Sequence, residues 1–223
     1  MIISVHIPKT AGTSFGERLE GAFGSRLLRD YGDFPEVGIA RPMALAADDK
    51  TARRIEISHG YDVIHGHFRA DKYADLFSEA KIIAFFRDPY HQAISGYDNA
   101  MRRPDIDHPV IRMIHAARMS LVESVAAFPN PQVTYLGRID LGDLAMIGLT
   151  EQYSRSVALF EATTGRKLPP ESSRKNVNRL RPSAGYEVTP ELRNAVTIHR
   201  GADVELYNSA CERFERLCAR YGV

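Results

Sequence analysis

The sequence predicts an α/β fold in which a central, mostly parallel sheet is flanked by helices. Short, β-branched apolar runs alternate along the chain with segments of helical periodicity, which is the pattern of strands joined by crossover helices. With 223 residues, the chain has the length of one large domain with a single core. In such folds ligands bind at the carboxyl ends of the strands, so the strand ends are where functional residues are expected.

The first strand and helix are predicted at the amino terminus. Ile2 to Ile7 is an apolar, β-branched run that stops at Pro8, as a buried strand entering a loop would. Phe15, Leu19 and Phe23 then recur at helical spacing as far as Gly24. The order strand, loop, helix is the order in which many phosphate-binding loops are built.

Two further strands are predicted at Asp62 to Phe68 and at Lys81 to Arg87. Asp88 and Pro89 combine an N-cap with a first-turn proline and open a helix that runs to about Met101. The later elements are a short helix with a capping box at Ser120 to Glu123, a strand at Leu144 to Leu149, a helix capped by Thr150 and ending near Gly165, a helix opening at Thr189 and Pro190, and a last helix with the apolar stripe Leu206, Ala210, Phe214, Leu217 and Tyr221.

One stretch lacks a clear period. Arg29 to His59 is interrupted by glycine and proline, and we expect it to be a lid or an acceptor-contacting insertion within the single domain of residues 1–223.

The overall charge gives no reason to expect a nucleic-acid or membrane partner. There are 29 basic and 28 acidic residues, so an anion site must be local, and residues 166–200 form a basic stretch. No apolar run is long enough to span a membrane and no leader is recognisable, which favours a cytoplasmic protein. Cys211 and Cys218 are expected to be free, buried thiols.

The loop after the first strand has the chemistry of an anion site. Lys9 supplies a positive charge, Gly12 permits close backbone approach, and Thr10, Thr13 and Ser14 add hydroxyl groups at a helix N-terminus. In a Walker loop the lysine follows the last glycine, whereas here it precedes it. The residues favour a bound phosphate or sulfate, and the alternative is a lysine near an ordinary capped helix.

A second anion site is predicted at the end of the strand that closes with Arg87. An arginine at a strand's carboxyl end can grip a phosphate, and Ser95 follows two helical turns later. Two anion sites at neighbouring strand ends suggest a nucleotide that carries phosphates at both ends. Taken alone, Arg87 could equally be an ion-pair residue.

The histidines of His65-Gly66-His67 are two residues apart on a predicted strand and therefore face the same side. Metal ligation would need a third ligand, and a hydrogen-bonded structural pair is a second interpretation. General-base chemistry is the third, since neutral histidine is suited to removing a proton from a hydroxyl group near pH 7.

Three stretches, HIPKTAGTSF, FFRDPYHQAISGY and IGLTEQYSRSVALF, resemble the sulfotransferases that use 3′-phosphoadenosine 5′-phosphosulfate (PAPS), in particular the heparan sulfate uronyl 2-O-sulfotransferase branch and its bacterial relatives. The resemblance implies a three-layer, P-loop-like fold. It also implies that the 5′-phosphosulfate is held by Lys9, Thr10, Gly12, Thr13 and Ser14, that the 3′-phosphate is held by Arg87 and Ser95, and that no metal is required.

By the same resemblance His67 is the catalytic base, His65 helps to orient the substrate or the base, and Lys9 stabilises the leaving phosphate. Arg174 and Lys175 are candidates for contacts with the nucleotide or with an acidic acceptor. The expected acceptor is a hydroxyl compound, either a carbohydrate or a small molecule. The alternatives are a non-catalytic relative that binds a nucleotide or a sulfated glycan, and a small-molecule kinase with an unusual loop.

Overall fold

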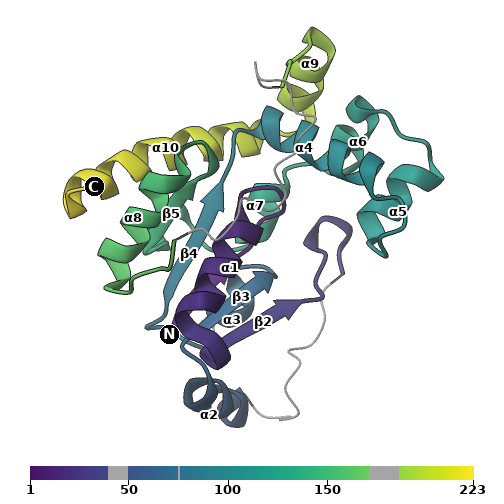
Figure 1. The fold of residues 1–223 in the computed structure, drawn as a ribbon. Helices are drawn as coiled ribbons and strands as arrows, with labels where there is room; N and C mark the ends of the chain where they lie inside the picture. Colours follow the sequence, from purple (N-terminus) through teal and green to yellow (C-terminus); the bar gives the residue numbers. More distant parts are fainter. Residues whose placement is uncertain (40–49, 75, 171–185) are drawn as a thin grey trace.

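Five parallel strands form the central sheet of the protein (Figure 1). A computed structural model describes residues 1–39, 50–74, 76–170 and 186–223, with no side chains described for 50–53. The sheet order is β2-β3-β1-β4-β5, so the first strand lies at the centre. The strands are β1 (Ile2–Val5), β2 (Leu27–Tyr31), β3 (Val63–His67), β4 (Lys81–Phe86) and β5 (Met146–Leu149).

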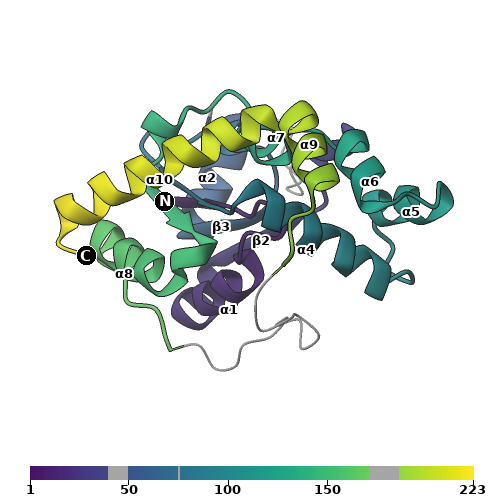
Figure 2. The ribbon, with the colours of Figure 1, turned by 90° about the horizontal axis from the view of Figure 1, so that it is seen from above.

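Helices cover both faces of the sheet, which gives the three layers that the sequence predicts. Seen from above, α1 and α8 lie on one side of the strands, and α7 and α10 lie on the other (Figure 2). The α-helices are α1 (Gly12–Phe23), α2 (Lys50–Gly60), α3 (Asp71–Ala74), α4 (Pro89–Arg102), α5 (Pro109–Ala116), α6 (Leu121–Ala127), α7 (Pro131–Leu136), α8 (Tyr153–Thr164), α9 (Pro190–His199) and α10 (Gly201–Tyr221).

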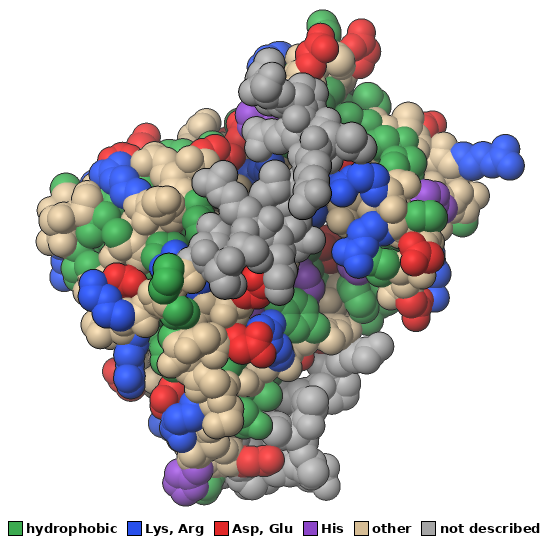
Figure 3. Space-filling model, viewed as in Figure 1, with side chains coloured by type: hydrophobic (Ala, Val, Ile, Leu, Met, Phe, Trp, Pro, Cys, Tyr) green, Lys and Arg blue, Asp and Glu red, His purple; other side chains and the backbone are tan. Residues whose placement is uncertain are grey.

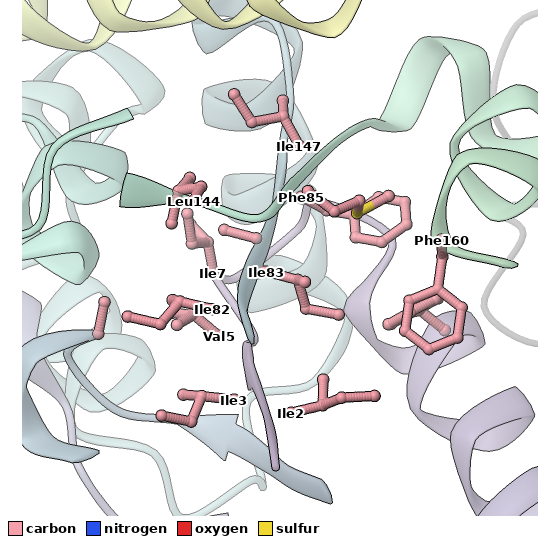
Figure 4. Close-up of a cluster of buried hydrophobic side chains, with 14 of the residues drawn as sticks. Ile2, Ile3, Val5, Ile7, Ile82, Ile83, Phe85, Leu144, Ile147 and Phe160 are labelled. Atoms are coloured by element: carbon pink, nitrogen blue, oxygen red, sulfur yellow. The ribbon is translucent and has the colours of Figure 1, made fainter. Parts of the chain in front are cut away.

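The main core lies on both sides of the central strands. Ile3 and Ile82 project to one side of the sheet, whereas Ile2, Ile83 and Phe85 project to the other (Figure 4). Because strands buried on both faces need apolar residues at successive positions, β1 and β4 are the near-continuous apolar runs seen in the sequence.

A helical lobe made of α4, α5, α6 and α9 stands beside the carboxyl ends of the strands (Figure 1). It has apolar clusters of its own, one around Val125 and Val196 and another around Ile111 and Phe128. The lobe therefore forms a wall facing the sheet edge at which the loops after β1, β3 and β4 meet.

Most of the predicted elements are confirmed, including three of the four predicted N-caps. Asp88 accepts a hydrogen bond from the His91 amide, Ser120 and Glu123 form the capping box, and Thr189 accepts from the Leu192 amide. The prediction for Thr150 is wrong: residues Thr150–Gln152 form a 3₁₀ helix, η4, and the Thr150 hydroxyl donates to the Phe86 carbonyl instead of capping α8.

The stretch Arg29 to His59 is more regular than its sequence suggests. Its first three residues belong to β2, paired with β3, and α2 begins at Lys50. Residues 40–49 lie outside the described part of the chain. Whether the stretch acts as a lid or contacts an acceptor stays a prediction.

The apolar stripe of the last helix is confirmed only in part. Ala210, Phe214 and Leu217 are buried, but Tyr221 is 37% exposed at the end of α10. Both cysteines are free thiols. Cys218 is buried as expected, whereas Cys211 is only half-buried.

Charges of both signs are spread over the face of the molecule in Figure 3, as the near balance of basic and acidic residues requires. In the described part of the chain, no helix is both long enough and apolar enough to cross a membrane.

Candidate functional site

A cavity of about 910 Å³ lies at the carboxyl ends of the strands, between the sheet and the helical lobe. Its lining comes from the loop after β1, the ends of β3 and β4, the middle and end of α4, α5 with the loop before it, and the start of α8. The predicted site residues among its lining are Lys9, Gly12, Thr13, Ser14, His67, Arg87 and Ser95. The fold thus brings together three stretches that lie far apart in the sequence.

The loop from Pro8 to Gly12 has an unusual backbone and forms part of the cavity wall. Lys9 and Ala11 both have a φ of 67°, in the left-handed region that non-glycine residues seldom adopt. No side chain caps the first turn of α1. Alternating backbone conformations of this kind form concave nests of N–H groups, and an uncapped helix start adds its dipole, so the loop suits an anion.

The hydroxyl groups of the loop differ in position. Thr13 and Ser14 line the cavity, but the Thr10 side chain is fully buried and donates to the Ile7 carbonyl at 2.8 Å. In this structure the Thr10 hydroxyl therefore holds the loop together, and Thr10 is not among the residues that line the cavity.

Position 12 requires glycine because the ring of His6 packs closely against its backbone. A Cβ atom at this position would collide with the ring of His6, and one at Gly16 would lie 2.6 Å from Nε2 of His65. Gly66 has a similar role, because a Cβ atom there would collide with the Asp30 carbonyl of the neighbouring strand β2. The space beside Gly66 is therefore occupied by the backbone of β2.

Arg87, which belongs to the second predicted anion site, is hydrogen-bonded to the loop that forms the first. Its guanidinium Nη1 donates to the Lys9 carbonyl at 3.0 Å, and its backbone amide donates to the side chain of Gln132. Ser95, which is buried in α4, lines the same cavity. The arginine is therefore fixed beside the Lys9 loop, at the end of β4.

The cavity concentrates positive charge around Lys9. Burial, together with Arg87, Arg102 and Arg103, lowers the pKa of Lys9 to about 8, and Asp98 opposes this shift. One carboxylate among the lining residues, Glu151, is already bound by the Asp88 amide and the Tyr207 hydroxyl. Such a cluster of like charges favours an anionic ligand, since an anion relieves the repulsion.

One ring nitrogen of His67 is engaged in a hydrogen bond to the backbone. Its Nδ1 lies 2.7 Å from the carbonyl oxygen of His6, which can only accept, so Nδ1 carries the proton and Nε2 is the basic nitrogen. Burial is the largest cause that lowers the pKa of His67 to about 4, and His108 adds to it. The imidazole is therefore neutral near pH 7, in the state that accepts a proton.

His65 is placed differently from His67 although both face the same side of β3. Its Nε2 donates to the Gly12 carbonyl at 3.2 Å and its Nδ1 accepts from the Ser4 hydroxyl at 2.9 Å. The side chain is buried and does not line the cavity, and burial lowers its pKa to about 3. Both nitrogens are thus engaged by the protein.

Two residues beside the histidines were not singled out by the sequence reasoning. His6 stacks on His65 and His67, with ring centroids 5.3 Å and 4.3 Å apart, and lines the cavity. Tyr31, at the end of β2, has its hydroxyl 2.9 Å from Nδ1 of His6. The predicted strand ran to Ile7 and so included His6, whereas β1 ends at Val5 and leaves His6 at the strand's carboxyl end.

Further lining residues were also not singled out, namely Asn99, Arg102, Arg103, His108, Tyr186 and the segment from Thr150 to Arg155. That segment lies within the stretch IGLTEQYSRSVALF, which carried the resemblance without any residue being assigned a role. Arg174 and Lys175 lie outside the described residues, so their predicted contacts stay predictions. Among the residues with described positions, no group of three or more His, Cys, Asp or Glu could hold a metal ion.

Comparison with known proteins identifies the fold. No protein-family model matches the sequence, and no curated protein matches it. The crystal structure of a sulfotransferase from Alicyclobacillus acidocaldarius is similar, with a TM-score of 0.51 and 17% sequence identity over 93% of this chain and 94% of that chain. Mouse sulfotransferase SULT7A1 complexed with PAP has a TM-score of 0.41 and 13% identity over 75% of this chain and 60% of that chain. At such identity the likeness is one of architecture, and the chain shares its α/β fold with the bacterial sulfotransferase.

Proposed function

We propose that the protein is a sulfotransferase that moves a sulfuryl group from PAPS to a hydroxyl acceptor. The observation that carries the proposal is that one cavity contains the Lys9 loop, Arg87 with Ser95, and a neutral His67. The two anion sites suit a nucleotide with phosphates at both ends, and the histidine suits removal of a hydroxyl proton. The shared fold of the bacterial sulfotransferase supports this assignment.

The nucleotide is proposed to bind along the cavity from the Lys9 loop to α4. Lys9, the backbone of Gly12, and the hydroxyls of Thr13 and Ser14 would hold the 5′-phosphosulfate, while Thr10 keeps the loop in shape through its bond to the Ile7 carbonyl. Arg87 and Ser95 would hold the 3′-phosphate, and Arg174 and Lys175 remain candidates for the same end. An anion bound beside Lys9 would also restore the lysine's full charge, since opposite charge favours the protonated form.

In the proposed reaction, His67 Nε2 takes the proton of the acceptor hydroxyl while the acceptor oxygen forms its bond to sulfur. The bond from sulfur to the 5′-phosphate oxygen breaks in line with that attack, and Lys9 stabilises the charge left on this oxygen. A positioned base contributes roughly 10² to 10⁴ in rate. Near an anionic ligand the pKa of His67 would rise from about 4 toward the range useful to a base.

His65 is proposed as a positioning residue. By joining Ser4 of β1 to the Gly12 carbonyl of α1, it fixes the start of the helix against the strand, and through its stacking on His6 it supports the ring beside His67. A cytoplasmic location and a carbohydrate or small-molecule acceptor remain part of the proposal.

The first test is calorimetry with 3′-phosphoadenosine 5′-phosphate (PAP) and with ATP and Mg²⁺. We expect metal-independent binding of PAP that is weakened at least tenfold in Arg87→Ala, whereas Arg220→Ala, an exposed arginine at the end of α10, serves as the matched control. A preference for ATP with Mg²⁺ would point to a kinase. PAP binding with no release of PAP from PAPS against a panel of hydroxyl acceptors would point to a non-catalytic binding protein.

A further inference from the structure

A second, smaller pocket lies between the helical lobe and the loop after β1, and shares part of its wall with the large cavity. Its volume is about 140 Å³. Its apolar lining comes from α4, α5 and the end of α6, namely Ala93, Tyr97, Ala100, Val110, Ile111, Ile114 and Phe128. A cavity of about 150 Å³ lined by aliphatic and aromatic side chains is large enough to hold one benzene ring.

The small pocket adjoins the candidate site. Pro8, Lys9, Asn99, His108 and Ile111 line both spaces. His108 also acts electrostatically on His67, so the shared wall lies close to the proposed base. A ligand with its hydroxyl between Lys9 and His67 would therefore have to pass His108 to reach the pocket.

The polar residues of the pocket balance each other in charge. Glu36 and Arg200 both line it: burial raises the pKa of the Glu36 carboxyl and lowers that of the Arg200 guanidinium to about 10, and each group partly offsets this effect on the other. Gln92 is 4% exposed, and its Oε1 has no hydrogen-bond partner among the described residues, as is also true of Nε of Arg200. Apart from Lys9 at the shared wall, the pocket thus favours a neutral group, with a polar edge where one hydroxyl could be accommodated.

We propose that this pocket, lined by α4, α5 and Arg200, binds the apolar part of the acceptor. The acceptor is then a hydroxyl compound whose body ends in an apolar ring or a short branched chain, and an unsubstituted sugar does not fill the pocket. The proposal rests on the sulfotransferase function proposed above, because that function supplies the reacting hydroxyl.

Gly96 offers a way to fill the pocket without rebuilding the core. It lines the pocket from within α4, and a Cβ atom placed there would meet only Cγ of Lys9, at 3.9 Å. Leucine at this position would occupy the space meant for the ligand, and alanine would occupy less of it. Both residues favour a helix over glycine. Gly60→Leu, at the exposed end of α2 and in neither cavity, is the matched control.

The test measures binding of 2-naphthol and of methyl glucoside to the full chain by calorimetry, with PAP present and absent. With PAP bound, we expect 2-naphthol to bind more tightly than methyl glucoside. We expect Gly96→Leu to weaken 2-naphthol binding at least tenfold and Gly96→Ala to weaken it less, while PAP affinity in both variants and all binding to Gly60→Leu stay unchanged.

Equal binding of 2-naphthol to the wild type and Gly96→Leu would overturn the proposal, as would tighter binding of the glucoside than of 2-naphthol. If Gly96→Leu does not fold, the graded comparison of Gly96→Ala with the wild type decides. Failure of PAP to bind the wild type would instead refute the sulfotransferase assignment, and 2-naphthol binding without nucleotide would then still report on the pocket.

Discussion

Nδ1 of His67 lies 2.7 Å from the backbone carbonyl oxygen of His6. Since that oxygen is fixed at the carboxyl end of β1, the ring of His67 on β3 has one tautomer and one orientation. The hydrogen bond between neighbouring strands thus prepares Nε2 as a proton acceptor before any ligand binds.

The first prediction concerns that nitrogen. We expect His67→Ala to keep PAP affinity within about twofold and to lower PAPS turnover by roughly 10² to 10⁴, because a positioned base is worth about this factor. Calorimetry and a PAP-release assay measure the two quantities, with His199→Ala, at the end of α9 and in neither cavity, as control. Unchanged turnover in His67→Ala would rule out the histidine as base.

The second prediction is the pH dependence of kcat/KM, which reports the free enzyme. His67 must be neutral and Lys9 protonated, so activity should fall below about pH 4 and above about pH 8. The acid limit is measured by rapid pH-jump assays, since the folded state itself weakens in acid. An acid limb centred on pH 6.5 would contradict the low pKa of His67.

The third prediction is proton uptake by Lys9 when PAP binds. At pH 9 the free lysine, with a pKa of about 8, is mostly neutral, and a bound anion returns it to the charged form. Calorimetry in two buffers of different ionisation enthalpy should show uptake of up to one proton at pH 9 and much less at pH 7. Lys9→Met, which keeps the length of the side chain, should abolish the difference.

The fourth prediction concerns Gly12. A methyl group there collides with the His6 ring, so Gly12→Ala should destabilise the fold by about 1 to 3 kcal/mol and weaken PAP binding. Adding His6→Ala should recover part of the loss, and denaturant unfolding of both single variants and the double variant gives the coupling. Additive effects would show that the two residues do not interact.

The fifth prediction is loss of stability in mild acid. The pKa values of His65 and His67 in the folded protein lie at about 3 and about 4, below the usual 6.5, and that of His6 is lowered as well. Below pH 6.5 the unfolded chain binds protons that the folded chain does not, so the free energy of unfolding falls as pH decreases.

The expected slope is roughly 1.4 kcal/mol per pH unit for each such histidine. Urea unfolding between pH 7 and 5 measures this slope. His65→Asn should lower the number of protons taken up on unfolding by about one, and the slope falls accordingly. A stability that is flat over this range would contradict the buried, neutral state of these rings.

Much of the fold could be predicted from local pattern. The apolar run of β1, the Asp88-Pro89 start of α4 and the capping box of α6 each act through residues that are neighbours in sequence. β2 was missed because its residues, Leu27–Tyr31, alternate in burial and include charged side chains typical of a sheet edge. Their pairing with β3 decides their structure, and no local signal reports it.

The candidate site was predictable to the extent that its residues stand at strand ends. Lys9, Arg87 and His67 were identified in this way and do line one cavity. Thr10 and His65 belong to the same motifs, yet their polar atoms are used by the Ile7 carbonyl and by Ser4 and Gly12. Which member of a motif faces the cavity depends on strand pairing and loop conformation.

The sequence by itself determined the alternation of strands and helices and the chemistry placed at their junctions, since periodicity, caps and residue type act over a few residues. Only the tertiary structure decided that the carbonyl of His6 holds the ring of His67 while the ring of His6 stacks on His65. It also decided that α4 and α5 line an apolar pocket beside Lys9. These relationships join residues up to about a hundred positions apart, and they arise from packing across the sheet edge, which no local pattern encodes.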